Sequence, residues 1–347
     1  MLEPLATRSV ESVVGRLGAV QAQADFAAEL SVATRRTNSK PGDVAAALGA
    51  GRLIKTFAFR GATHLMTPED GGTYLALRAA SKMWELPSWQ SYYGLKPSDW
   101  PAFRTTVRDA LADGPLTRQE LGAAVAMHAR FRHLGFAFAD KNWTLLKPLN
   151  WQGDMCFGPS VGGRATFQRL DLNPRWRGVP DIEEAGPRAV EAYFAAYGPS
   201  TPKHVNYWLG EGLGAGRKRI TAWIAQLGDK LVAVDVEGES ALALRENLDD
   251  LLAASETAAV RLLPGYDQWL LGPGTADAHV TPPQRRTLVT RGANVVIASG
   301  IVSGTWSLRE DRIAVDWFAE AGTFPRQSVA HEIERLGMIL GRDIEPA

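Results

Sequence analysis

The chain has 347 residues, a mass of 37.6 kDa, and 38 basic against 38 acidic side chains, which leaves no formal net charge. With 45% apolar and 22% charged residues, the composition excludes a disordered chain and indicates a globular protein of two to four packed units. The balanced charge gives no support for nucleic-acid binding through bulk electrostatics, so only a local basic patch would provide it.

The first predicted element is a helix with an apolar stripe made of Val10, Val13, Val14, Leu17 and Val20. Gln21-Ala22-Gln23 follows directly. Side chains two residues apart point about 200° apart on a helix but to the same side of an extended chain. If Gln21 and Gln23 serve one site, the backbone must therefore leave helical geometry near Gln21. The alternative is that both are ordinary surface or cap residues.

A short helix and a strand pair are predicted next. The helix covers Lys40–Leu48, and the strands cover Arg52–Arg60 and Ala62–Met66. Arg60 suits an anion contact, and His64 suits proton handling or hydrogen bonding. A polar turn without a function is the alternative.

An internal repeat organises the middle of the chain. Gly114–Leu121 reads Gly-Pro-Leu-Thr-Arg-Gln-Glu-Leu, and Gly198–Val205 reads Gly-Pro-Ser-Thr-Pro-Lys-His-Val. In both copies a Gly-Pro turn precedes a threonine, Thr117 or Thr201, that is placed to cap the next helix. Pro202 then takes the first helical position, where its missing N–H has no cost.

The segments around the two copies also correspond. Around the first copy we expect helices at Trp100–Leu111 and Asp140–Leu149 and strands at Asp154–Phe157 and Arg164–Leu170. Around the second copy we expect helices at Pro187–Tyr197 and Arg217–Leu227 and strands at Lys230–Val236 and Ala241–Arg245. A helix, a capped helix, another helix and a hairpin form a winged helix-turn-helix. The pattern therefore predicts tandem winged-helix units, with a weaker third copy at the front of the chain.

Beyond Asp250 the pattern changes to strands, which are predicted at Ala258–Leu263, Arg286–Thr290, Asn294–Ala298, Val302–Leu308 and Arg312–Phe318. In the last strand, every second residue from Ile313 to Trp317 is large and apolar, the period of a half-buried strand. A final helix is expected at about Pro325–Leu340, with Gly341 as its C-terminal stop.

Basic residues gather in four short clusters, which are Arg35-Arg36, Arg175-Trp176-Arg177, Arg217-Lys218-Arg219 and Arg285-Arg286. The third cluster lies where a winged helix places its DNA-facing helix, so it suits contacts with phosphates. Scattered surface arginines would explain each cluster separately, although three of the four fall at predicted turns or helix starts.

Signals for other classes of protein are weak. A single cysteine, Cys156, excludes an intrachain disulfide framework and a cysteine-based zinc site, and it fits a reducing cytoplasm. The six histidines have no spacing suited to a metal ion. The N-terminus lacks a basic segment followed by an apolar one, and no apolar run approaches the ~20 residues of a membrane span. We therefore expect a cytoplasmic protein with no metal, no cofactor and no membrane partner.

An ordered set of short motifs resembles the AlkZ/YcaQ-type winged-helix DNA glycosylase family, on its AlkZ-like Gln-x-Gln branch. The motifs are Leu17–Gln23, Arg60–His64, Gly198–Thr201, Trp208–Gly210, Leu262–Gly272 and Gly304–Trp306. Each motif is short, but together they are spread in order over nearly the whole chain.

The resemblance implies an α+β fold in which three tandem winged-helix units and a C-terminal β-rich unit are C-shaped around a DNA-binding cleft. The units would span residues 1–98, 99–182, 183–250 and 251–347. The implied activity is that of a monofunctional bacterial glycosylase that hydrolyses the N-glycosidic bond of bulky alkylated purines. Its substrates would be antibiotic-derived monoadducts and interstrand crosslinks, in base-excision repair and self-resistance. The implied partner is double-stranded DNA with alkylpurine lesions, bound by a monomer.

The resemblance also implies the site residues. Gln21 and Gln23 match the family's catalytic Gln-x-Gln pair. The DNA contacts that we expect are Arg60, His64, Lys203, Arg217, Lys218, Arg285 and Arg286. The family's DNA-probing hairpin is assigned here to the strands around Val302–Val315. The zero net charge departs from the basic character expected of a DNA-binding protein.

Two other functions remain open from the sequence. A non-catalytic winged-helix regulator would read DNA sequence through a recognition helix and would need neither glutamine. A drug-sequestering resistance protein would use some of the eleven tryptophans to bind the antibiotic, although core packing is an ordinary use of those rings.

Overall fold

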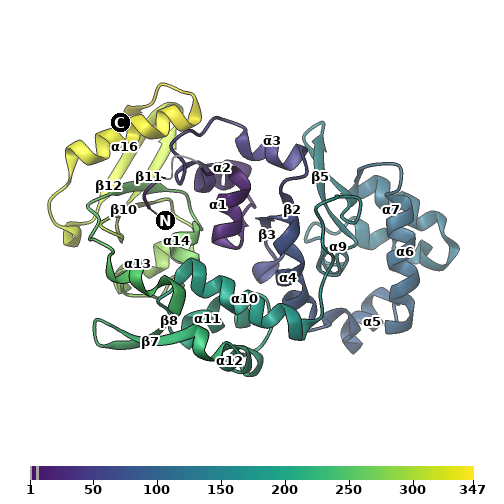
Figure 1. The fold of residues 1–347 in the computed structure, drawn as a ribbon. Coiled ribbons are helices and arrows are strands. Elements are labelled where there is room, and N and C mark those ends of the chain that lie inside the picture. Colours follow the sequence, from purple (N-terminus) through teal and green to yellow (C-terminus); the bar gives the residue numbers. More distant parts are fainter. Residues whose placement is uncertain (1, 5–7) are drawn as a thin grey trace. The chain divides into compact units, whose positions relative to one another are not determined.

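The computed structural model describes residues 2–4 and 8–347; Met1 and residues 5–7, part of the segment used for the signal-peptide prediction, lie outside the described residues. The chain divides into two compact units, each built from separated segments. The first comprises Met1–Ala47, Glu191–Trp208 and Leu227–Ala347, and the second comprises Leu48–Val190 and Leu209–Gln226. Helices and strands occur in both (Figure 1), so the predicted α+β class is confirmed. The four consecutive units of the sequence analysis stay a prediction.

The second compact unit begins with an antiparallel hairpin of β2 (Ile54–Phe57) and β3 (Thr63–Met66). The first strand is shorter than predicted because Phe59–Gly61 forms a 3₁₀ turn. Within that turn Arg60 has a φ of 51°. The backbone therefore turns before the residue that the sequence placed at the end of the strand.

The first copy of the repeat forms the order that was predicted for it. Its elements are α6 (Trp100–Ala110), β4 (Leu116–Thr117), α7 (Arg118–Met127), β5 (Met155–Val161) and β6 (Arg164–Arg169). The three strands form a sheet in the order β4-β6-β5. Thr117 accepts a hydrogen bond from the backbone N–H of Glu120, whose carboxylate accepts one from the N–H of Thr117. This capping box begins α7 as the Gly-Pro-x-Thr pattern predicts.

One predicted helix of this unit is much shorter than expected. The structure has α9 at Leu146–Trp151 rather than a helix from Asp140. The Asp140 carboxylate accepts hydrogen bonds from the backbone N–H groups of Asn142 and Thr144. Such a side chain offers the backbone an alternative to helical bonding, so a turn replaces the first part of the helix.

The other helices of the second unit are α4 (Pro68–Ala79), α5 (Pro87–Tyr93), α8 (Gly135–Phe138) and α12 (Arg217–Gln226). Two further helices, α3 (Asp43–Gly49) and α10 (Ile182–Tyr197), pass from one unit into the other. Helix α10 begins before the predicted start and contains Pro187.

The first compact unit holds the second copy of the repeat and the N-terminal helices. These elements are α1 (Val10–Leu17), β1 (Val20–Gln21), α2 (Asp25–Ala33), α11 (Pro202–Val205), β7 (Leu231–Val236), β8 (Glu239–Leu244) and α13 (Leu248–Leu252). Thr201 accepts a hydrogen bond from the backbone N–H of His204, and Pro202 is the first residue of α11. The predicted cap and proline position are therefore confirmed.

The C-terminal part of the same unit is a five-stranded sheet in the order β13-β12-β11-β10-β9. Its elements are β9 (Val260–Leu263), α14 (Gln268–Leu271), α15 (Arg286–Thr290), β10 (Val295–Ala298), β11 (Ile301–Arg309), β12 (Arg312–Trp317), α16 (Arg326–Leu340) and β13 (Glu345–Pro346). Helix α16 packs on the sheet through Val329, Ile333 and Leu336, which share a core with Leu262 and Trp306 (Figure 1). Gly341 ends α16 in the left-handed conformation, as predicted.

The predicted strand at Arg286–Thr290 is wrong, because these residues form α15. Threonine, leucine and valine in this segment favour a strand locally. A 3₁₀ turn at Pro283–Arg285 leads directly into the helix, and proline is well suited to a first helical turn. Only Val289 of the five residues is buried, as expected of a single turn lying on the surface.

Candidate active site

The segment that carries Gln21 and Gln23 is extended rather than helical, and the helix ends before Val20, which the sequence analysis had placed on its apolar stripe. Helix α1 ends at Leu17, and Gly18 turns the chain with a φ of 75°. Val20 and Ala22 are buried, with exposed fractions of 1% and 0%, whereas Gln21 is half-buried and Gln23 is exposed. This alternation is that of an extended chain, so both glutamines point away from the core.

The two carboxamides lie against each other. Gln21 Nε2 donates a hydrogen bond to Gln23 Oε1 at 3.1 Å. Among the residues that the structure describes, neither amide makes another side-chain hydrogen bond. A carboxamide does not titrate near neutral pH, and its oxygen accepts two hydrogen bonds. The pair therefore offers neutral acceptors to water or to a developing positive charge.

The basic cluster Arg35-Arg36 is not a surface patch. Arg35 is buried and forms a bidentate ion pair with Asp267, at 2.9 and 2.7 Å, and Arg36 pairs with Asp43 at 2.6 Å. Sequence reasoning missed Asp267 as a partner, because 232 positions separate it from Arg35. The sequence feature that could have drawn attention to Asp267 was its position inside the Leu262–Gly272 motif. In the second cluster, Arg175 pairs with Glu69 at 2.6 Å.

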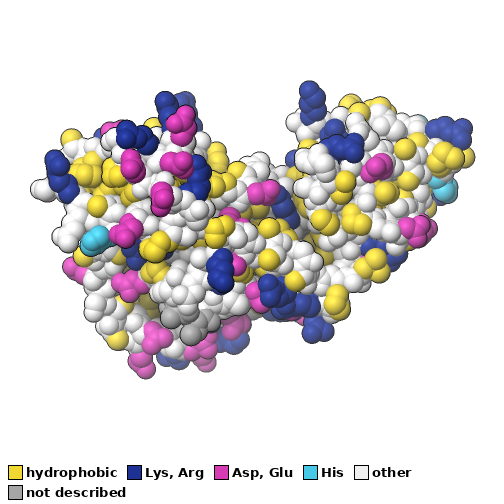
Figure 2. All heavy atoms as spheres, turned by 90° about the horizontal axis from the view of Figure 1, so that it is seen from above, with side chains coloured by type: hydrophobic (Ala, Val, Ile, Leu, Met, Phe, Trp, Pro, Cys, Tyr) yellow, Lys and Arg dark blue, Asp and Glu magenta, His cyan; other side chains and the backbone are white. Residues whose placement is uncertain are grey.

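Four of the residues expected to contact DNA lie on helices and are exposed to solvent. Lys203 in α11, Arg217 and Lys218 at the start of α12, and Arg286 at the start of α15 are all exposed. Arg60 is also exposed, at the left-handed turn after β2. Basic and acidic side chains are both present on the face shown in Figure 2, so the zero net charge comes from a mixture of charges.

Arg285 forms an ion pair with an acidic side chain. Its guanidinium donates two hydrogen bonds to the Glu320 carboxylate, at 2.6 and 2.9 Å, and lies 3.9 Å from the ring centre of Phe318. The hydrogen bond to Glu320 raises the pKa of Arg285, and the same bond lowers the pKa of Glu320 to about 2.

His64 lies in the core of the second compact unit, with 2% of its surface exposed. Its Nδ1 atom is 3.1 Å from the backbone oxygen of Ala62, and its ring packs against Phe59. Burial lowers its pKa to about 4, so the ring is neutral at physiological pH. These features indicate a packing role for His64 rather than contact with DNA.

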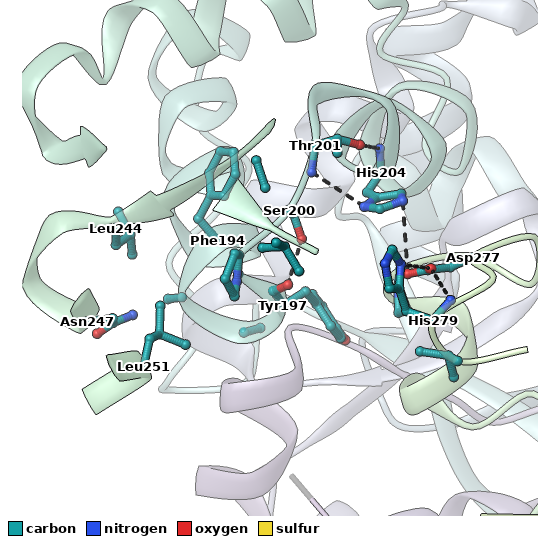
Figure 3. A pocket seen from close by; sticks show the side chains of 18 of the residues that line it. Phe194, Tyr197, Ser200, Thr201, His204, Leu244, Asn247, Leu251, Asp277 and His279 are labelled. Atoms are coloured by element: carbon teal, nitrogen blue, oxygen red, sulfur yellow. Dashed lines mark hydrogen bonds and ion pairs between the residues drawn. The ribbon is translucent and has the colours of Figure 1, made fainter. Parts of the chain in front are cut away.

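A pocket of about 440 Å³ lies at the C-terminal end of α10 in the first compact unit (Figure 3). Its lining includes Phe194, Tyr197, Ser200, Thr201, His204 and Asp277. The Thr201 N–H donates to His204 Nδ1 at 3.4 Å, and His204 Nε2 lies 4.0 Å from an Asp277 oxygen. Neither glutamine of the pair lines this pocket, so it is separate from the amide site.

Over residues 2–4 and 8–347, no three histidine, cysteine or acidic side chains are grouped so that they would hold a metal ion. Within the same part of the chain, no helix combines the length and apolar character needed to cross a membrane.

Comparison with known proteins identifies the class of protein. The model of the "DNA glycosylase AlkZ-like" family matches residues 14–339. The chain therefore belongs to the AlkZ-like DNA glycosylases, enzymes that hydrolyse N-glycosidic bonds in DNA.

A curated relative and a solved structure extend this result. The chain is 35% identical to the "Interstrand DNA cross-link repair glycosylase" of Streptomyces sahachiroi over 98% of this chain and 93% of that protein. The solved structure of "Streptomyces sahachiroi DNA glycosylase AlkZ" matches with a TM-score of 0.92 and 34% identity, over 99% of this chain and 94% of that one. The family resemblance read from the sequence is thus confirmed, as is the α+β fold.

Proposed function

We propose that this DNA glycosylase excises bulky alkylated purines, both antibiotic-derived monoadducts and purines joined in interstrand crosslinks, and protects its host from the alkylating agent. Gln21 and Gln23 carry the reaction. The observation that best supports this proposal is the hydrogen bond between the two amides on the solvent-facing side of an extended segment. The name of the Streptomyces sahachiroi relative, which repairs interstrand crosslinks, supports the class of substrate.

The substrate supplies most of the activation. A purine alkylated on an imidazole nitrogen carries positive charge, so it leaves the sugar without protonation by a strong acid. The bond between the base and the anomeric carbon breaks, and the departing base takes the electron pair and becomes neutral. Water then forms a new bond to the anomeric carbon and releases a proton to solvent, through an oxocarbenium-like transition state.

The amide pair suits the remaining task. An amide oxygen accepts a hydrogen bond from the attacking water and lies against the positive charge that develops on the sugar. A glutamine is a poor general base, so the reaction depends on a cationic leaving group. Unmodified purines and neutral lesions are therefore poor substrates. A bulky or crosslinked base stays outside a tight pocket, because complete extrusion of such a base is sterically unfavourable.

The exposed cations provide the contacts with the DNA backbone. Lys203, Arg217, Lys218, Arg286 and Arg60 bind phosphates, whereas the Glu320 carboxylate reduces the contribution of Arg285. The hairpin of β11 and β12 probes the duplex near the lesion.

The direct test is release of the base from a duplex with one cationic N7-alkylguanine, measured for wild type, Gln21→Ala and Gln23→Ala. Each substitution is expected to lower the single-turnover rate by about 10²–10³-fold, the usual effect of removing one electrostatic contact to a transition state. Gln119→Ala, which changes an exposed glutamine on α7, is the matched control and should retain the wild-type rate. Wild-type rates in both glutamine variants would reject the assignment of the pair.

Two further outcomes separate the alternatives. The mechanism needs no lysine, so borohydride should trap no covalent DNA adduct, and a trapped adduct would refute direct attack by water. A regulator would release no base and would bind specific DNA sequences. A drug-sequestering protein would show tryptophan quenching by free drug without DNA.

A further inference from the structure

The catalytic segment begins at a helix end whose last carbonyl has a side-chain partner. Leu17 is the last residue of α1, and a helix end leaves its carbonyl groups without partners inside the helix. Tyr197 donates its hydroxyl hydrogen to the Leu17 oxygen at 2.7 Å. This bond lies one residue before the turn at Gly18 that sets the direction of the chain toward Gln21.

The ring of Tyr197 is itself held in place. Tyr197 is the last residue of α10, and the centre of its ring lies 5.1 Å from the ring centre of Tyr193. The backbone oxygen of Tyr197 accepts a hydrogen bond from the Ser200 hydroxyl at 2.6 Å (Figure 3). Gly272 packs so closely on the ring that a Cβ at this position would lie 2.1 Å from it. These contacts restrict the ring and so its hydroxyl, which makes the side chain a suitable support for a backbone carbonyl.

The helix that follows the catalytic segment is held through Asp267, near the C-terminal end of that helix. Helix α2 follows the segment, and its Ser31 donates to Asp267 at 2.8 Å beside the buried ion pair of Arg35. Asp267 also caps α14 by accepting the N–H of Trp269. The residues on both sides of the glutamine pair are therefore tied to the short stretch that begins at Asp267.

Gln268, the next residue, completes the link between the two supports. Its side chain reaches Tyr197 Oη at 3.4 Å, and its Nε2 atom is buried without a hydrogen-bond partner among the described residues. The atom that faces the Tyr197 hydroxyl is Gln268 Oε1, a second and more distant acceptor beside the Leu17 oxygen. This contact places Gln268 beside the tyrosine that supports the Leu17 carbonyl.

We propose that Tyr197 and Asp267 are positioning residues for the glutamine pair. Tyr197 fixes the carbonyl at the start of the segment between α1 and α2, and Asp267 fixes the C-terminal part of α2, the helix that follows the segment. Together they keep both carboxamides on one side with their mutual hydrogen bond intact. They act through the backbone and touch neither DNA nor the reacting sugar. This inference rests on the function proposed above for Gln21 and Gln23.

The test compares two tyrosines of α10 that lie one turn apart. Tyr197→Phe removes the bond to Leu17. The matched control Tyr193→Phe keeps the ring that packs on Tyr197 and removes only a hydroxyl, which bonds to the Gly272 carbonyl at 2.9 Å and does not contact the catalytic segment. Single-turnover excision and DNA affinity are measured for both, below their melting temperatures. We expect Tyr197→Phe to lower the excision rate at least about tenfold, since small misplacement of reacting groups has large effects. The DNA affinity of Tyr197→Phe and the excision rate of Tyr193→Phe should stay within about twofold of wild type.

A second measurement is independent of activity. The side-chain amide signals of Gln21 and Gln23 in ¹⁵N–¹H spectra, assigned from the alanine variants, should shift in Tyr197→Phe and in Asp267→Asn but not in Tyr193→Phe. Equal excision rates in the two tyrosine variants, or unshifted amide signals, would overturn the inference while leaving the proposed function intact. A wild-type protein that releases no base would instead reject the proposed function, and the positioning role with it.

Discussion

Gln21 and Gln23 are joined by a single hydrogen bond, from the amide nitrogen of the first to the amide oxygen of the second at 3.1 Å. The bond fixes the orientation of both side chains relative to each other. Because Gln21 uses its N–H group, its own oxygen stays available as an acceptor, and Gln23 Oε1 keeps a second lone pair. The pair thus presents neutral acceptors on one side of the chain rather than a titrating acid and base.

The absence of a titrating group in the pair predicts a flat pH profile. Between pH 5.5 and 8 the single-turnover rate on a cationic lesion should change little, because neither carboxamide gains or loses a proton. Gln23→Glu should introduce a rate that rises with pH around the pKa of the new carboxyl, about 4.3 for an unperturbed glutamate. Rate measurements on both proteins from pH 4 to 8 check this. A bell-shaped wild-type profile would mean that a titrating residue outside the pair takes part.

Much of the local structure followed from the sequence. Thr117 and Thr201 cap the helices that the repeat predicted, Gly341 ends the last helix, and the chain is extended at Gln21. In these cases the physical cause lies within a few residues, in a cap, a left-handed position or an alternation of buried side chains. Patterns of this kind are visible without any knowledge of the tertiary structure.

The residue pairs that hold the catalytic segment in place could not be predicted from the sequence. Arg35 looked like part of a basic surface cluster, yet its partner Asp267 is 232 positions away, and Tyr197 meets Leu17 across 180 positions. No local pattern encodes such pairs, because they depend on how distant segments pack. The wrong strand at Arg286–Thr290 has a different, local origin. The 3₁₀ turn at Pro283–Arg285 leads directly into a helix and outweighs the preference of these residues for a strand.

The ion pair of Arg35 and Asp267 should be important for stability as well as for the site. Their side chains are 6% and 0% exposed, so Asp267→Ala leaves an unpaired charge in the core. Breaking one partner of a buried pair typically destabilises a protein by about 3–5 kcal/mol. Urea unfolding monitored by tryptophan fluorescence measures this change in the free energy of unfolding.

The control for this experiment is an exposed ion pair. Arg188 and Glu184 lie 3.1 Å apart with side chains that are 51% and 63% exposed. Arg188→Ala should therefore change the free energy of unfolding by less than about 1 kcal/mol. Similar effects of the two substitutions would contradict the assignment of a buried, structurally essential pair.

Burial of His64 predicts acid sensitivity of the fold. Its pKa is about 4 in the folded protein, against 6.5 for the ordinary side chain. Between these values the unfolded chain binds a proton that the folded chain does not, so stability falls as the pH falls from 6.5 to 4. The full difference corresponds to roughly 3 kcal/mol.

Replacement of this histidine should remove that part of the pH dependence. Urea midpoints for wild type, His64→Gln and the exposed control His331→Gln are compared at pH 7.5, 5.5 and 4.5. We expect His64→Gln to lose less stability over this interval than the other two proteins. Three parallel curves would show that His64 is not the group responsible.

The adjacent arginines of α15 should differ in their contribution to DNA binding. Arg286 is exposed at the start of the helix, whereas Arg285 forms its ion pair with Glu320. Loss of one phosphate contact makes the slope of log K against log salt less negative by about 0.9. Arg286→Ala should show this change, measured by fluorescence anisotropy on a lesion-containing duplex at 50 to 200 mM salt.

The double substitution Arg285→Ala with Glu320→Ala removes opposite charges together and should leave the slope unchanged. A reduced slope in the double variant, with none in Arg286→Ala, would instead assign the phosphate contact to Arg285.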